Sequence, residues 1–179
     1  MKKTIIVASM LAVLSSGAFA AAPSNGSAGG GQINFTGSII DSPCSIAPSD
    51  SELKVDLGQI SNSVLKKAGE SEVRPFTIHL ESCSTETLSA ATVRFNGDTD
   101  TVKTSDLKIM GTAKGAAIEL VDAEDNSPIA IGSKTKPHSL VDGDNALEFG
   151  AHLVSTLKDD ESGVPGDFAA TATFEMFYQ

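Results

Sequence analysis

Two cysteines and three histidines are the residues of this 179-residue sequence best suited to covalent or metal chemistry. Cys44 and Cys83 are its only cysteines, and such a pair forms either a disulfide or part of a metal site. A metal site needs further ligands at short spacing, but His79, His138 and His152 are scattered singly along the chain. The sequence therefore predicts no metal site and no cofactor, and it favours a disulfide if the protein is exported.

Acidic residues are the other candidates for catalytic or calcium-binding chemistry. Asp122 stands two residues before Glu124, and three acidic residues follow one another at Asp159–Glu161. Such groups can act as acid and base or as calcium ligands, but both lie among turn-forming residues, which indicates solvated loops. The sequence also has no nucleophile elbow, HExxH helix or phosphate-binding loop. We therefore expect that the protein is not an enzyme.

The first 20 residues have the pattern of a secretory signal peptide. Lys2 and Lys3 precede an apolar run at Thr4–Leu14, and Ala18–Ala20 has the small residues of a cleavage site. The run is too short to span a bilayer, so we expect a mature, soluble chain that begins near Ala21. Export to an oxidising compartment favours the disulfide between the two cysteines.

The charge of the chain excludes two classes of partner. It has 13 lysine and arginine residues against 23 aspartate and glutamate residues, a formal net charge of −10 at pH 7. Nucleic-acid phosphates and anionic lipid surfaces both require a basic face. We therefore expect no nucleic-acid partner and no direct membrane insertion.

From Gln32 to Gln179, short apolar segments alternate with polar turns rich in Gly, Pro, Asn, Asp and Ser. This pattern predicts an all-β sandwich with at most one helical turn, at Ser61–Lys67. The expected strands are Ile33–Asp41, Leu53–Leu57, Arg74–Glu81, Thr92–Asn96, Ile118–Asp122, Ile129–Ile131, Leu147–Val154 and Phe168–Tyr178.

The last expected strand is long, and its two faces differ. Its inward face is Phe168, Ala170, Ala172, Phe174, Met176 and Tyr178, whereas Ala169, Thr171, Thr173 and Glu175 suit solvent. By pattern alone, such an inward face is more often ordinary core. Only Gln179 follows this strand, so one of its edges needs cover from elsewhere. At the other end, residues 21–31 (AAPSNGSAGGG) form a flexible arm.

An ordered set of segments carries a resemblance to a known family. The segments are Ile33–Ile46, Pro75–Cys83, Val93–Gly97, Gly115–Leu120, Leu147–Phe149 and Pro165–Tyr178. Together they resemble the pilins of chaperone–usher fimbriae, near the major subunits of the type 1, P and mannose-resistant kinds. The resemblance implies an incomplete immunoglobulin-like β-sandwich that lacks its seventh strand. It also implies that a periplasmic chaperone lends this strand, and that the arm of the next subunit replaces it at the outer-membrane usher, an established example of strand addition.

The resemblance also implies domains and roles. Residues 1–20 would be the signal peptide, 21–36 the donor-strand extension and 37–179 the pilin domain. The two-residue alternation of a strand selects the donor residues Gly29, Gly31, Ile33 and Phe35, although a plain linker followed by a first strand would have the same sequence. The acceptor groove would be the inward face Phe168, Ala170, Ala172, Phe174, Met176 and Tyr178, with the terminal carboxylate of Gln179 held by basic groups of the chaperone.

The implied function is that of a structural subunit, exported through the periplasm, that polymerises with identical or related pilins into a cell-surface filament for adhesion. A minor or adaptor pilin is the first alternative. A secreted carbohydrate-binding β-sandwich is the second, although the sequence has only 5% aromatic residues and no tryptophan to stack on sugars.

Overall fold

The computed structural model describes residues 30–40, 42–158 and 161–179. The chain divides into two units, Met1–Ile39 and Ile40–Gln179. In the first unit, the described residues 30–39 form no helix or strand and are all exposed. The expected signal peptide and Gly29 lie outside the described residues. Among the residues described, no helix is long and apolar enough to cross a membrane.

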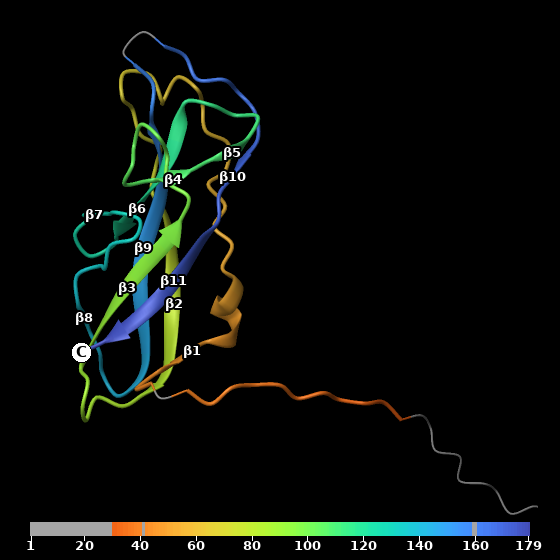
Figure 1. Ribbon diagram of the computed structural model, residues 1–179, viewed down its shortest axis with the longest axis vertical. Coiled ribbons are helices and arrows are strands. Elements are labelled where there is room, and N and C mark those ends of the chain that lie inside the picture. Colours follow the sequence, from red (N-terminus) through yellow and green to blue (C-terminus); the bar gives the residue numbers. More distant parts are fainter. Residues whose placement is uncertain (1–29, 41, 159–160) are drawn as a thin grey trace, which may run out of the picture. The chain divides into compact units, whose positions relative to one another are not determined.

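The larger sheet of the second unit is antiparallel and is built around β9 (Gly143–Ser155), as Figure 1 shows. β2 (Arg74–Cys83) pairs with one side of β9 and β6 (Ala116–Asp122) with the other. The short strands of this sheet are β1 (Ser45–Ile46) beside β2, with β4 (Leu107–Lys108) and β7 (Pro128–Ile129) beside β6. The last seven residues of β9 are all buried, as its central position requires.

The second sheet has the order β11 (Ala172–Tyr178), β3 (Ala90–Gly97) and β8 (His138–Ser139). β11 and β3 pair without interruption along the whole of β11. The residues just before β11 pair elsewhere, because β10 (Phe168–Ala169) lies against β5 (Met110–Gly111). The chain changes partner between β10 and β11, and this change divides the single strand expected at Phe168–Tyr178.

The two sheets enclose one hydrophobic core. Ile78 and Leu80 are fully buried at alternate positions of β2, and Val93 of β3 is also fully buried. Phe149 of β9 is also fully buried, and its ring meets the ring of Phe95 edge-on with 5.2 Å between the centroids. The alternation predicted for β2 is therefore confirmed.

The strands expected at Arg74–Glu81, Thr92–Asn96, Ile118–Asp122 and Leu147–Val154 are confirmed within β2, β3, β6 and β9. The strand expected at Ile129–Ile131 is displaced to Pro128–Ile129.

Two expected strands are wrong. Residues 33–40, within the strand expected at Ile33–Asp41, and Leu53–Leu57 form no strand. At Ser61–Lys67, where at most one helical turn was expected, the chain forms turns, and the N–H of Val64 donates to the C=O of Ser61 at 2.9 Å. A strand exists only where a neighbour completes its ladder, and in the described part of the chain neither of the first two segments has one. The pattern of the sequence did not predict η1 (Pro48–Glu52), a 3-10 helix that Pro48 begins.

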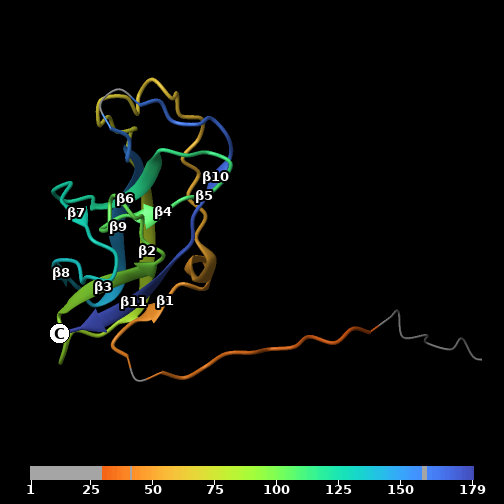
Figure 2. The ribbon, with the colours of Figure 1, turned by 45° about the horizontal axis from the view of Figure 1, so that its top comes forward.

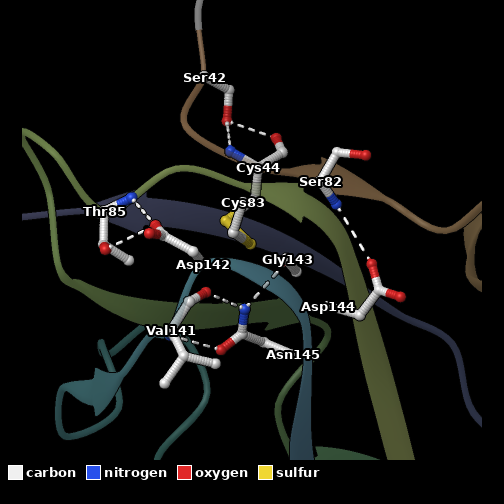
Figure 3. Close-up of a disulfide and its surroundings, with 10 residues drawn as sticks. All are labelled: Ser42, Cys44, Ser82, Cys83, Thr85, Val141, Asp142, Gly143, Asp144 and Asn145. Atoms are coloured by element: carbon white, nitrogen blue, oxygen red, sulfur yellow. Dashed lines mark hydrogen bonds between the residues drawn. A yellow bond between two sulfur atoms is a disulfide. The ribbon is translucent and has the colours of Figure 1, made fainter.

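Cys44 and Cys83 form the expected disulfide, which joins the chain before β1 to the end of β2 (Figure 3). Both cysteines are buried. Next to the disulfide, the N–H and the hydroxyl of Thr85 each donate to Oδ1 of Asp142 at 2.7 Å. These bonds lower the pKa of Asp142, and the bond from the hydroxyl has the larger effect. They fix the loop after β2 to the loop before β9.

Candidate functional site

Within the described part of the chain, β11 pairs with a strand on one side only. The bonds of its partner β3 show which residues face the other side. The C=O of Val93 accepts the N–H of Thr135 at 2.8 Å and the N–H of Val93 donates to the Thr135 hydroxyl at 3.0 Å, away from β11. Because the bonding direction alternates along a strand, β3 bonds to β11 through positions 92, 94 and 96, which face 177, 175 and 173. The residues whose N–H and C=O groups face the open edge are Ala172, Phe174, Met176 and Tyr178.

Side-chain direction alternates along a strand with the same two-residue period as bonding direction, so these four residues also share one face of the sheet. On this face Phe174, Met176 and Tyr178 pack against the core. The inward residues that are half-buried and pack against the core are Phe168, Ala170, Phe174, Met176 and Tyr178. Ala172 is exposed. On the other face, Glu175 is exposed and its Oε2 lies 3.9 Å from Nε of Arg94. The open edge thus combines free backbone groups with an incompletely covered apolar face.

A cleft of about 870 Å³ lies beside the residues that lead into β11. One wall is Leu53–Ile60, which follows η1, and the other is Val164–Ala170, which includes β10. Figures 1 and 2 both show the gold segment after η1 running beside the blue chain near β10. The lining of the cleft includes the buried side chains of Leu65, Ile118 and Leu153. The walls also include the charged residues Lys54, Asp56 and Asp167.

Hydrogen bonds hold Asp50 in η1, just before the first wall of the cleft begins. Its buried carboxylate accepts the N–H of His79 at 2.6 Å through Oδ2, which also lies 2.8 Å from Nδ1 of His79. Oδ1 accepts the hydroxyl of Ser49 at 2.8 Å. The bond from the backbone N–H of His79 is the main cause that lowers the pKa of Asp50. The His79 side chain is exposed, as the alternation of its strand predicts.

We expect Asp50→Asn to lower the free energy of unfolding by about 1–2 kcal/mol at neutral pH, because it weakens charge-assisted bonds at a buried site. The folded state lowers the pKa of Asp50, so its contribution is present above the pKa of an unfolded aspartate and is lost as the pH falls through the folded value. Urea midpoints of the two proteins should therefore converge in acid. The control is Asp98→Asn, at an exposed aspartate. A difference that persists unchanged in acid would contradict this assignment.

The described part of the arm is exposed and uncharged, and it carries apolar side chains at alternate positions. Ile33 and Phe35 are 76% and 89% exposed. A Cβ built on Gly30 or Gly31 would have no atom within 4 Å. No residue from Gly30 to Ile40 is charged. The alternation of Ile33 and Phe35 with polar neighbours is that of a strand, but these residues have no strand structure here.

Gln179 holds the end of β11 in place. Its N–H donates to the C=O of Ala90 at 2.9 Å, and one oxygen of its terminal carboxylate accepts the N–H groups of Ser89 and Ala90 at 3.0 Å each. The last residue of the chain is therefore fixed at the start of β3, where the open edge of β11 ends.

The family model described as fimbrial protein matches residues 33–179. The chain belongs to the fimbrial protein family. Fimbria A protein of Serratia marcescens is 47% identical over 153 residues, which cover 84% of this chain and 86% of that protein. The Major MR/P fimbria protein of Proteus mirabilis is 44% identical over 152 residues, which cover 84% and 85%. This fimbrial protein is thus a structural pilin and not an enzyme.

Solved structures of fimbrial proteins confirm the expected fold class. The P pilus rod subunit PapA is similar with a TM-score of 0.67 and 26% identity, over 77% of this chain and all of that one. A structure of a chaperone–usher pilus that reveals the molecular basis of rod uncoiling contains a similar subunit. The TM-score is 0.73 and the sequences are 27% identical, over 85% of this chain and 97% of that one. The adaptor subunit PapF is only 18% identical, so that likeness concerns the fold alone. The fold is therefore the all-β, immunoglobulin-like sandwich of pilus subunits.

Proposed function

We propose that this fimbrial protein is a polymerising subunit of a chaperone–usher pilus, and that the open edge of β11 accepts a strand from the next subunit. The observation that carries the proposal is that the same residues present free backbone groups and an incompletely covered apolar face. A strand laid along this edge would bond to the N–H and C=O groups of Phe174, Met176 and Tyr178. It would also cover their half-buried side chains.

The arm of a second copy is the occupant whose chemistry fits. In a strand, Gly29, Gly31, Ile33 and Phe35 share one face, and the stretch 29–39 has as many residues as 168–178. Because the arm is uncharged, it can enter the groove without desolvating an ion of its own. Burial of Ile33 and Phe35 would contribute about 1.5–3 kcal/mol each. On this proposal, residues 1–20 are the signal peptide, 21–36 the donor extension and 37–179 the pilin domain.

Before assembly, the same edge needs a temporary partner, since an exposed apolar strand edge promotes aggregation. We infer that a periplasmic chaperone supplies a strand and binds the terminal carboxylate of Gln179 with basic groups, and that exchange occurs at the outer-membrane usher. The signal pattern of residues 1–20 supports transit through the periplasm to a surface filament. The relatives named Fimbria A and Major MR/P support the role of a major subunit.

The test uses the domain without residues 21–36, refolded with its disulfide, and a peptide of residues 27–38. We expect the peptide to raise the melting temperature by about 10 °C or more, because it binds the folded state alone and adds several kcal/mol. Thermal melting followed by circular dichroism measures the shift.

The matched control is the same peptide with aspartate at Ile33 and Phe35, which should give no shift. A cooperative melt that neither peptide changes would mean that the sandwich is already closed, and it would refute strand acceptance.

A further inference from the structure

Folding brings His138 beside Asp122 and Glu124, although no short spacing in the sequence links it to them. Asp122 ends β6, Glu124 lies in the following turn and His138 begins β8, and one ligand atom from each lies within 4.8 Å of the others. The expectation that Asp122 lies in a solvated loop is wrong, because it is only 3% exposed. The turn folds back on it, since its N–H donates to the C=O of Ser127 at 2.9 Å. Glu124 is exposed, as expected.

His138 directs its Nε2 into this cluster, toward Asp122. The residue is 6% exposed, and within the described residues its Nε2 has no hydrogen-bond partner. This nitrogen lies 3.3 Å from Oδ2 of Asp122, whereas Oδ1 of Asp122 accepts the N–H of Glu124 at 3.0 Å. The ring of Phe149 meets the imidazole edge-on at 5.5 Å and restricts its orientation. Nε2 of His138 therefore has a carboxylate oxygen nearby but no aligned hydrogen bond, which is uncommon for a buried polar atom.

The geometry and charge of the cluster suit a cation. Ligands bound tetrahedrally at about 2.0–2.1 Å lie roughly 3.4 Å apart, close to the separation of Nε2 of His138 and Oδ2 of Asp122. The exposed Glu124 can rotate to supply a third ligand, which leaves the fourth position to water. Among the described residues, the ammonium group of Lys136 pairs with Asp125 rather than with Asp122 or Glu124, so the two ligand carboxylates keep their negative charge for a cation.

We propose that Asp122, Glu124 and His138 bind one divalent transition-metal ion, and that zinc is the best match to one imidazole and two carboxylates. β6 belongs to the larger sheet and β8 to the second sheet, so the bound ion links the two layers of the sandwich. β8 and β11 lie on opposite sides of β3, and Figures 1 and 2 place β7 and β8 on the side of the domain away from β1. The ion therefore stabilises the subunit without entering the groove.

The test uses the full exported chain, purified without a histidine tag and stripped with a chelator. Calorimetric titration with zinc should give one ion per chain, and zinc should raise the melting temperature more than calcium or magnesium does. Glu124→Gln, at an exposed position, should weaken zinc binding about tenfold or more without loss of folding. His138→Gln should abolish binding.

Two control variants separate this site from adventitious zinc binding. Glu86→Gln removes an exposed carboxylate elsewhere, and His79→Gln removes an exposed imidazole. Both should bind zinc as the unaltered chain does. Zinc binding that survives Glu124→Gln and His138→Gln, binding lost equally in the two controls, or no binding at millimolar zinc would each overturn the proposal.

Discussion

A subunit carrying Ile33→Asp should fail to enter filaments, whereas one carrying Asn34→Asp should assemble as the unaltered protein does. The two variants add the same charge at adjacent positions of the arm. They differ in which face of the donated strand carries the charge. With aspartate at position 33, the complex would lose the 1.5–3 kcal/mol, roughly, that burial of the isoleucine contributes. Moving the carboxylate into the apolar groove would cost several kcal/mol more in desolvation. Aspartate at position 34 would face solvent.

Filament yield by electron microscopy, with subunit export checked by immunoblotting, measures this difference. A second readout shows that the Ile33→Asp subunit is still folded. Its own groove is unchanged, so the native arm peptide should still raise its melting temperature. Assembly defects of equal size in the two variants would contradict a phased strand and would favour a linker role for the arm.

The strands that the sequence predicts well are those whose signal is local. In β2, the alternation of Phe76, Ile78 and Leu80 fixes both the strand and its buried face. The inward phase of Phe174 and Met176 in β11 was predicted in the same way. Leu53–Leu57 shows a similar alternation and yet forms no strand. The pattern states which side chains share a face, but a ladder also requires a neighbouring strand, and local sequence does not contain that information.

Contacts between distant residues account for what sequence analysis missed at the candidate sites. The carboxylate of Asp50 meets His79 across 29 positions of the chain, and Asp122 meets His138 across the two sheets. Neither pair has a motif spacing, because sheet topology brings the partners together. The cleft wall Leu53–Ile60 was missed for a related reason, since it lines a site by lacking a strand partner in the described chain.

Replacement of both cysteines, Cys44→Ala with Cys83→Ala, should lower the free energy of unfolding by about 4 kcal/mol. The disulfide closes a loop with a sequence separation of 39, and the chain-entropy model gives this value for a loop of that length. Domains of this size are commonly stable by only about 5–15 kcal/mol. The variant should therefore be close to unfolding while its groove is empty, and it should depend on strand donation to remain folded.

The size of this loss should not depend on whether the groove is filled. The disulfide acts mainly by restricting the unfolded chain, whereas a donated strand stabilises the folded state, so the two effects should add. Urea unfolding of the original and doubly substituted domains, each with and without the arm peptide, measures the stabilisation by the disulfide and by the peptide. The four free energies also show whether the two effects add. Thr85→Ala is the control, since it weakens the neighbouring contact with Asp142 and leaves the loop closed. A disulfide effect that vanishes when the peptide is bound would show that the bond shapes the groove itself.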